Sequence, residues 1–248
     1  MLNVQSMREN LFGRDFVCGD LHGCVDLLMQ GLGALNFDPL ADRVFCVGDL
    51  TGRGPKSMDT LGLLDKPWFY AVRGNHDTLL ELYAMGVGSK QAMAKNGEGW
   101  FCELDKEAQS RIVDRLRAMP DVLLVGFEGL QGFNVFHAEF LGNQAELAAG
   151  KERYTRDGME ELHWGRSLIQ DIRTEGRMTQ SGLRLGSIWD SVRLARSFVG
   201  HTVVKHPTEV KNMVFVDTGA FRVYRGSAAQ SKHGFLSVVD AQGLQGLA

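Results

Sequence analysis

Short runs of apolar residues alternate with polar, glycine-containing turns along much of the chain. Runs of this length that are rich in β-branched and aromatic residues and bounded by glycine predict buried strands. Several runs end directly at an aspartate, asparagine or histidine, so polar side chains gather where the predicted strands end. The predicted strands are residues 16–18, 44–47, 68–72, 133–136, 197–199, 214–216 and 235–239.

Helical periodicity separates the first three predicted strands. Apolar residues spaced by three and four positions predict a helix over residues 25–35, and further helices are predicted over 57–64 and 106–119, the last ended by Pro120. The strand–helix–strand order implies parallel strands joined by right-handed crossovers. Fewer helices separate the later strands, so we expect an α/β fold: a β-sandwich of mixed sheets flanked by helices, with a βαβαβ core.

The chain length bounds the domain organisation. At roughly 150 residues per domain, 248 residues make one large domain or two small ones. We expect a single domain over residues 1–248, with its core at about 15–240. Residues 142–187 are polar and glycine-rich, and they form an excursion that is either a solvated surface segment or a lobe facing the substrate.

Composition and charge narrow the class of protein. The chain has 44% hydrophobic and 23% charged residues, as soluble globular proteins do. Its net charge of −3 argues against nucleic acid as a partner, because such binding needs a basic surface. No apolar run approaches the ~20 residues of a membrane helix, so no membrane partner is expected.

Cysteine usage and the first residues predict a cytoplasmic protein. Residues 1–15 contain no apolar signal core. None of the cysteines forms a C-x-x-C pair, and two of them lie inside apolar runs, which argues against a disulfide framework or a thiolate zinc site. Cys24 stands at a predicted helix start, where a reactive thiol is conceivable but less favoured than the chemistry around it. The four cysteines are Cys18, Cys24, Cys46 and Cys102.

Six metal-ligating side chains recur at strand ends. Asp20 and His22 follow the first predicted strand, Asp49 stands 29 residues after Asp20, and Asn75 stands 26 residues after Asp49. Each interval fits one crossover of about 30 residues, so these side chains return to the same edge of the sheet. Two histidines are the first polar residues after later apolar runs. The complete candidate set is Asp20, His22, Asp49, Asn75, His137 and His201.

The donor types indicate which metals would bind. Two carboxylates, one amide oxygen and three imidazoles, without a thiolate, suit Mn²⁺, Fe or Zn²⁺ better than Cu(I) or Ca²⁺. Six ligands exceed the need of one tetrahedral zinc ion. They suit two divalent ions if one carboxylate bridges them.

These motifs resemble those of the calcineurin-like metallophosphoesterases, and the fold implied is the metallophosphoesterase-type β-sandwich. Within that family the chain looks most like small bacterial and bacteriophage-lambda-type Ser/Thr protein phosphatases. The family blocks are Gly19-Asp20-Leu21-His22-Gly23, Gly48-Asp49 with Arg53-Gly54, Gly74-Asn75-His76-Asp77, His137-Ala138 and Gly200-His201-Thr202. The closer match rests on residues 71–76, Asn96-Gly97-(x)-Gly99-Trp100-Phe101, Trp164 with Arg166, and residues 217–220.

The resemblance implies a two-metal phosphoesterase in which a hydroxide between the metals attacks phosphorus in line. One metal would be held by Asp20, His22 and a bridging Asp49, and the other by Asp49, Asn75, His137 and His201. Mn²⁺ is the expected metal, with Fe or Zn²⁺ as alternatives.

Three further residues receive catalytic roles from the resemblance. Arg53 and Arg166 would clamp the phosphoryl oxygens, since a guanidinium fork matches two oxygens at once. His76 would donate a proton to the leaving oxygen. Asp217 is expected to brace the site by hydrogen bonds rather than to bind metal.

Two positions depart from the protein-phosphatase pattern and resemble bacterial symmetrical dinucleoside-tetraphosphatases. Gly52 stands where an aspartate usually orients the acid histidine, and Asp77 stands where glutamate is usual. Without a carboxylate at Gly52, His76 is expected to be a less fixed acid, which would favour phosphoanhydrides and aryl phosphates. The substitution Gly52→Asp is then expected to help poor leaving groups most.

The sequence therefore leaves alternatives open for function. The favoured one is a Ser/Thr protein phosphatase, with dual specificity left open, and its partner is a phosphorylated protein. A second is a symmetrical dinucleoside tetraphosphate (diadenosine tetraphosphate) hydrolase, whose substrate is a dinucleotide or another small phosphate ester. The third, from another class, is a degraded enzyme that acts as a regulatory binding module. The oligomeric state is not predicted.

Overall fold

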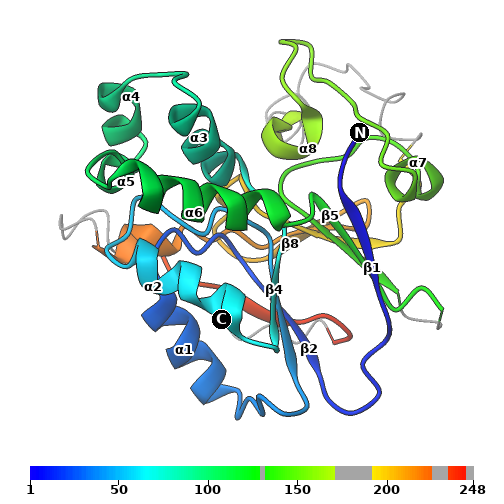
Figure 1. The fold of residues 1–248 in the computed structure, drawn as a ribbon. Coiled ribbons are helices and arrows are strands. Elements are labelled where there is room, and N and C mark those ends of the chain that lie inside the picture. The colour runs from blue at the N-terminus through cyan, green and yellow to red at the C-terminus, as the bar shows by residue number, and fades with distance from the viewer. Residues whose placement is uncertain (129–131, 171–191, 225–233, 244–248) are drawn as a thin grey trace, which may run out of the picture.

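Two mixed β-sheets form the centre of the molecule (Figure 1). The computed structural model describes residues 1–248 except 129–131, 171–191, 225–233 and 244–248. One sheet has the strand order β10-β2-β3-β4, and the other has the order β1-β5-β6-β7-β9-β8. The strands are β1 Val4–Met7, β2 Asp15–Cys18, β3 Arg43–Cys46, β4 Phe69–Ala71, β5 Val122–Val125, β6 Phe133–Phe136, β7 Arg196–Val199, β8 Thr208–Val210, β9 Met213–Phe215 and β10 Val238–Asp240.

The predicted βαβαβ core is confirmed. β2, β3 and β4 are parallel neighbours, while β10 runs antiparallel to β2. Helix α1 (Val25–Ala34) connects β2 to β3, and α2 (Ser57–Leu61) with the 3-10 helix η1 (Gly62–Asp65) connects β3 to β4. The single helix predicted over residues 57–64 is thus divided into an α-helical turn and a 3-10 turn. Because the three strands are parallel, their carboxyl ends meet at one edge of the sheet.

The two sheets bury a shared apolar layer. Val17 and Phe45 of the four-stranded sheet belong to the same buried cluster as Phe133 and Phe198 of the six-stranded sheet. The rings of Phe45 and Phe133 meet edge to face with centroids 5.5 Å apart. Each fully buried side chain of this size contributes roughly 1.5–3 kcal/mol to the stability of the sandwich.

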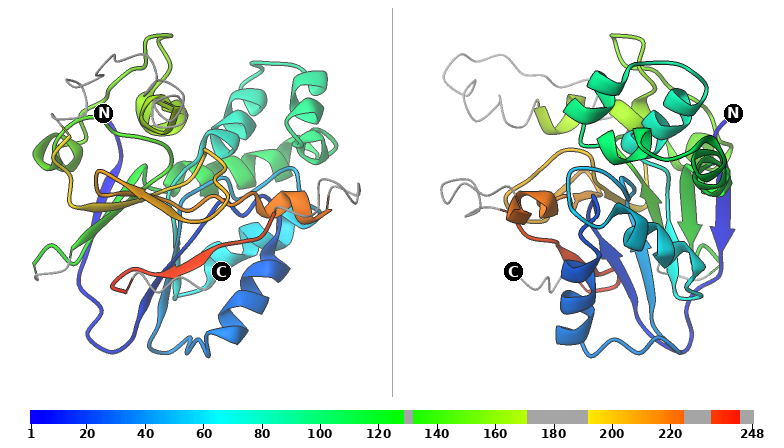
Figure 2. Two further views of the ribbon diagram at one scale, coloured as in Figure 1. Left: turned by 180° about the vertical axis from the view of Figure 1, so that it is seen from behind. Right: turned by 60° about the vertical axis from the view of Figure 1, so that its left-hand side comes forward.

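Helices cover the outer face of the four-stranded sheet. In α6 (Lys106–Ala118), the buried residues Ile112 and Leu116 lie on one stripe, and the Asp105 side chain caps the helix by accepting from the Ala108 amide. Pro120 follows the helix end, as predicted. Figure 2 shows α1 against the sheet edge that carries β10. The remaining helices on this side are α3 (Asn75–Ala84), α4 (Lys90–Lys95) and α5 (Gly99–Cys102).

The described part of the polar excursion packs on the outer face of the six-stranded sheet. It contains α7 (Gln144–Ala148) and α8 (Glu161–Trp164). Leu147, Leu162 and Leu168 are buried in a second apolar cluster together with strand residues of that sheet. Up to residue 170, the segment is therefore part of the core rather than solely a solvated excursion, and residues 171–187 lie outside the described residues. Over the described ranges, no helix combines the length and apolar character needed to cross a membrane.

Candidate functional site

The six predicted ligands lie at the ends of strands from both sheets, and all six are buried. Asp20 and His22 follow β2, Asp49 follows β3, and Asn75 is the first residue of α3 after β4. The remaining two come from the six-stranded sheet, one after β6 and one after β7, and these are His137 and His201. The fold therefore brings together residues that are up to 181 positions apart: the His201 backbone amide donates to Asp20 Oδ1 at 3.1 Å.

Backbone strain is concentrated at these strand ends. His22, Asp49, Arg53 and His201 have φ values of +43°, +49°, +63° and +62°. They are four of the seven non-glycine residues with positive φ among the residues that the structure describes. Each such residue costs on the order of 1–3 kcal/mol, and such strain clusters where function requires a particular side-chain direction.

Asp49 is the shared member of two groups of ligand atoms. Its carboxylate oxygens lie 3.5 Å from His22 Nε2 and 3.5 Å from His137 Nε2. Two sets of atoms, each within 4.8 Å of one another, contain Asp49: one with His22 and His76, the other with Asp20 and His137. A carboxylate placed between two such sets fits the bridging position that two divalent ions require.

Backbone carbonyls determine which imidazole nitrogens face the site. His22 Nδ1 donates to the carbonyl oxygen of Thr51 at 2.9 Å, and His137 Nδ1 donates to that of Val47 at 2.8 Å. A carbonyl can only accept, so the proton is on Nδ1 and the Nε2 lone pair points toward Asp49. Burial lowers the pKa of both histidines, which keeps them in the neutral form that ligates metals.

Atoms that carry lone pairs face one another in the cluster, and a cation between them could accept those lone pairs. Asn75 Oδ1 lies 2.9 Å from His137 Nε2, and both atoms carry lone pairs. Asn75 Oδ1 is also 2.9 Å from His201 Nδ1, and the buried Nε2 of His201 has no hydrogen-bond partner among the described residues. Burial and the charges of Asp217 and Asp49 raise the pKa of Asp20 well above its usual value, so an anionic Asp20 calls for a nearby positive charge. The residues therefore fit a divalent-cation centre.

Arg53 lies beside the ligand cluster, where the sequence placed it. Its Nη1 donates to His22 Nε2 at 2.9 Å and its Nη2 donates to His76 Nε2 at 2.8 Å. The guanidinium also lies over the ring of Phe221, with 4.8 Å from Cζ to the ring centroid. These contacts hold the Arg53 guanidinium between the Nε2 atoms of the two histidines. Burial lowers the pKa of His76, but Asp49 and Glu98 outweigh this effect and raise the pKa above its ordinary value.

The expectation that His76 lacks an orienting carboxylate is wrong. Glu98 is fully buried, and its Oε1 accepts from His76 Nδ1 at 3.1 Å. An ideal Cβ built on Gly52 would lie 2.1 Å from that same Oε1. The gain expected from Gly52→Asp alone therefore loses its basis, because the new side chain would meet Glu98. Sequence reasoning missed Glu98 because it follows no strand, although it is the charged residue inside the run 96–101.

Arg166 lies just after α8, near the turn that carries His201. Its Nη1 donates to Thr202 Oγ1 at 3.3 Å, next to His201. Burial lowers its pKa, and the negative charges of Asp20 and Asp217 act in the other direction. The predicted arginine thus lies within electrostatic reach of the cluster without an ion pair to either carboxylate.

Two further buried carboxylates brace the turns of the site. Asp77 accepts from the amides of Leu50 and Gly74 at 3.1 and 2.9 Å, and burial together with the charge of Asp49 raises its pKa to about 7. Asp217 accepts from the Gly219 amide at 2.8 Å, which agrees with the bracing role predicted for it. These contacts hold the turns after β3, β4 and β9.

Cys24 is not a candidate nucleophile. It precedes α1 and is buried, and its pKa is raised to about 12 by burial and by Asp26. A thiol with such a pKa is not a nucleophile near neutral pH.

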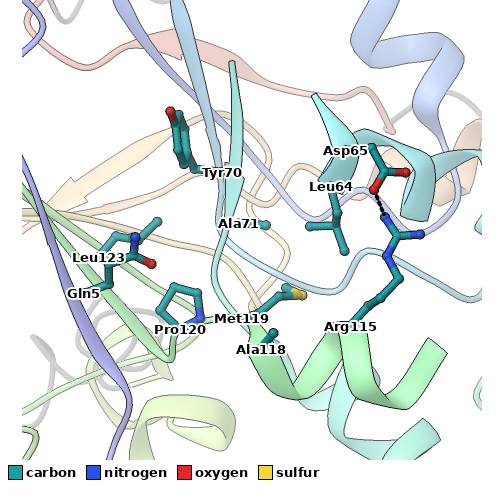
Figure 3. Close-up of a pocket in the computed structure, with 10 residues that line it drawn as sticks. All are labelled: Gln5, Leu64, Asp65, Tyr70, Ala71, Arg115, Ala118, Met119, Pro120 and Leu123. Carbon is teal, nitrogen blue, oxygen red and sulfur yellow. Dashed lines mark hydrogen bonds and ion pairs between the residues drawn. The ribbon is translucent and has the colours of Figure 1, made fainter. Parts of the chain in front are cut away.

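A separate pocket lies away from the ligand cluster (Figure 3). It has a volume of about 280 Å³ and lies between η1, the end of α6 and the strands β1, β4 and β5. Its walls include Leu64, Met119 and Leu123, and Arg115 is paired there with Asp65 at 2.7 Å. None of the predicted site residues lines this pocket, so it is not part of the candidate centre.

The chain is similar in sequence to phosphatases and tetraphosphatases of bacteria. The chain is 29% identical over 220 residues to Serine/threonine-protein phosphatase 2 of Escherichia coli (strain K12), covering 87% of this chain and 92% of that protein. It is 45% identical over 108 residues to the symmetrical Bis(5'-nucleosyl)-tetraphosphatase of Dechloromonas aromatica (strain RCB), covering 42% of this chain and 38% of that protein.

A solved structure shares the fold over nearly the whole chain. The crystal structure of a putative diadenosine tetraphosphatase superposes with a TM-score of 0.62 at 19% identity, covering 97% of this chain and 94% of that chain. The family described as calcineurin-like phosphoesterase matches residues 16–139, which include five of the six candidate ligands. The chain therefore belongs to the calcineurin-like phosphoesterase family.

Proposed function

We propose that the chain is a two-metal phosphoesterase that hydrolyses phosphate esters on serine and threonine residues of proteins. Membership of the family makes it a hydrolase with a dimetal centre. The observation that carries the proposal is the gathering of six candidate ligands around Asp49, with Arg53 between His22 and His76. A degraded binding module would have no need to retain strained backbone at these positions.

In the division of the ligands that we propose, which follows the family resemblance rather than the two sets of close atoms, both groups share Asp49. Asp20 and His22 would complete one group, and Mn²⁺ is the proposed ion, with Fe or Zn²⁺ as alternatives, because the donors are oxygen and imidazole. When bound, two such ions lower the pKa of coordinated water and polarise the phosphoryl oxygens. The second group would consist of Asn75, His137 and His201.

The remaining roles belong to side chains around the ligands. Arg53 and Arg166 would bind phosphoryl oxygens from two sides, which orients the ester for in-line displacement. His76 Nε2 faces the site, and it would give a proton to the leaving oxygen. A leaving serine alkoxide depends on that proton, because it is far more basic than a phenolate with a pKa of ~10.

The proposed substrate class rests on the extent of similarity. The relative that matches 87% of this chain is named a serine/threonine-protein phosphatase. The four buried, free cysteines support a reducing, cytosolic location for this activity.

A second candidate is hydrolysis of symmetrical dinucleoside tetraphosphates. It is favoured by the similarity at 45% identity over 108 residues and by Gly52 and Asp77, the two departures from the protein-phosphatase pattern. However, the contact between Glu98 and His76 removes the reason for expecting phosphoanhydrides and aryl phosphates to be favoured.

The two candidates are distinguished by rates on three substrates with Mn²⁺: a phosphoserine peptide, an aryl phosphate and diadenosine tetraphosphate. We expect the peptide to be cleaved with a kcat/KM at least tenfold above that for the dinucleotide. Asp49→Asn is expected to abolish all three activities, because both groups lose their shared ligand. A wild-type chain that cleaves only the dinucleotide would favour the second candidate, and one that cleaves none of the three would contradict both.

A further inference from the structure

Glu98 is a fully buried carboxylate, and one of its described side-chain contacts is with the candidate acid His76. Its Oε1 accepts from His76 Nδ1 at 3.1 Å, its Oε2 accepts from Trp100 Nε1 at 2.8 Å, and Thr51 Oγ1 lies 3.3 Å from both oxygens. Burying a carboxylate costs several kcal/mol unless hydrogen bonds or an opposite charge compensate. Among these partners, His76 alone can become positively charged.

The backbone is arranged to admit this carboxylate. Gly52 has a φ of +78°, and a Cβ there would occupy the position of Glu98 Oε1, at 2.1 Å. A Cβ on Gly97 would lie 2.4 Å from the Arg53 amide nitrogen, which itself donates to the Gly97 carbonyl. Two glycines therefore allow the loop that carries Glu98 to pack directly on the turn that carries Arg53.

The two nitrogens of His76 have different partners. Arg53 can only donate, so His76 Nε2 accepts from it and the proton is on Nδ1, which donates to Glu98. A carboxylate at Nδ1 fixes this tautomer and stabilises the imidazolium that forms when Nε2 also takes up a proton.

We propose that Glu98 is the positioning residue that holds His76 for proton donation to a poor leaving group. The inference rests on the proposed phosphoesterase function. In the step, the oxygen of water forms a bond to phosphorus while the bond from phosphorus to the alkoxide oxygen breaks. The leaving oxygen keeps the electron pair and takes the proton from His76 Nε2. The proton that water releases restores His76, so the products are the alcohol and inorganic phosphate.

The decisive experiment compares Glu98→Gln with wild type over a series of aryl and alkyl phosphates in Mn²⁺. Gln retains the size of the side chain and an accepting oxygen but removes its charge. We expect kcat for a phosphoserine peptide to fall by on the order of 10–100-fold, while kcat for a nitrophenyl phosphate changes less than about threefold. KM values and the Mn²⁺ concentration for half-maximal rate should stay unchanged.

The matched control is Glu161→Gln, which also neutralises a buried carboxylate but one that contacts Arg153 and the Leu141 amide. Its rates should keep the wild-type dependence on the leaving group. An equal loss on all substrates in Glu98→Gln, or no loss on any, would overturn the role of Glu98 while leaving the proposed function intact. A wild-type chain without any phosphatase activity would instead overturn the proposed function.

Circular dichroism and thermal unfolding show whether Glu98→Gln folds. If it does not, a carboxylate moved from position 98 to position 52 tests the role of Glu98. Glu98→Gly empties the space next to Gly52, and Gly52→Asp in the same chain would return a carboxylate to it. Aspartate tolerates the left-handed backbone conformation of that position. Recovery of at least tenfold in peptide kcat relative to Glu98→Gly alone supports the proposal, and no recovery overturns it.

Discussion

Gly200 shows how closely single residues are fitted to the candidate ligands. An ideal Cβ on Gly200 would lie 2.0 Å from Asp20 Oδ1 and 2.5 Å from Val47 Cγ2. Gly200→Ala should therefore displace the Asp20 carboxylate, and we expect a 10–100-fold lower kcat/KM on an aryl phosphate at fixed Mn²⁺, recovered in part at higher Mn²⁺. Rates measured across an Mn²⁺ titration test this expectation.

The control for this substitution is Gly33→Ala in α1. Apart from its chain neighbours and the backbone of its own helix, no atom of the described residues lies within 4 Å of a Cβ at that position. Alanine in an exposed helix position should leave the rates unchanged and add about 1 kcal/mol of stability. If Gly200→Ala keeps the wild-type Mn²⁺ dependence, Asp20 is not held in place by this contact.

Single residues were predictable from sequence when they followed a strand. Asp20, Asp49 and Asn75 occur at crossover spacing, and parallel strands bring such positions to one edge without further information. Glu98 lies in a loop between two short helices. In a loop, no periodic pattern of residues indicates which way a side chain points. Its contact with His76 depends on the missing side chain at Gly52, which becomes apparent only once the two loops are placed together.

At the scale of elements, a buried histidine joins α8 to the six-stranded sheet. His163 lies 2.5 Å from Glu160 and 3.3 Å from Asp121, the residue just before β5. Burial lowers its pKa, but the carboxylates of Asp121 and Glu160 outweigh burial and raise the pKa to about 9. A histidine with a folded pKa above its unfolded value of ~6.5 stabilises the fold below that value, and this contribution is lost as pH rises through about 9.

We expect His163→Gln to lower the free energy of unfolding by on the order of 2–3 kcal/mol at pH 6 and by much less at pH 10. Urea unfolding of both chains at the two pH values measures this difference. His206→Gln, which replaces an exposed histidine outside this cluster, is the control for the substitution itself. A constant difference for His163→Gln would mean that its ion pairs do not contribute to stability.

Burial alone did not decide which strands were predicted, because β5 is buried along its whole length and was missed. β6 occupies the residues predicted for it, β2 and β7 begin one residue earlier than predicted, and β3 lies one residue earlier at both ends. β1 and β8, the outermost strands of their sheet, were missed because their exposed positions break the apolar pattern. The packing of α8 was not predictable either, because its segment is polar overall and buries only isolated leucines such as Leu162.

At the scale of the whole molecule, the candidate centre joins the two sheets. Asp20 and Asp49 extend from the four-stranded sheet, while His137 and His201 extend from the six-stranded one. The sandwich and its βαβαβ core were predictable from sequence, but the sequence does not specify how deeply the two edges interdigitate. Metal ions bound between the two sheets would therefore stabilise the sandwich as well as support catalysis.

This geometry predicts that Mn²⁺ stabilises the folded chain. A ligand that binds only the folded state at 100 times its Kd adds about 2.7 kcal/mol, so the Tm should rise by roughly 5–10 °C over the chelated protein. Asp20→Asn should lose most of that rise. In chelator, at pH 8, the variant should be at least as stable as wild type, because burial and the charges of Asp217 and Asp49 oppose ionisation of Asp20.

The Tm measured with Mn²⁺ and with chelator tests the stabilisation by Mn²⁺ and its loss in Asp20→Asn. The control is Asp59→Asn, a substitution at an exposed position, which should keep the full rise in Tm with Mn²⁺. The two conditions should reverse the order of stability: wild type above Asp20→Asn with Mn²⁺, and no longer above it in chelator. Such a reversal cannot arise from a general loss of packing, which would lower the Tm in both conditions. An unchanged Mn²⁺ response in Asp20→Asn would place the binding ions elsewhere in the molecule.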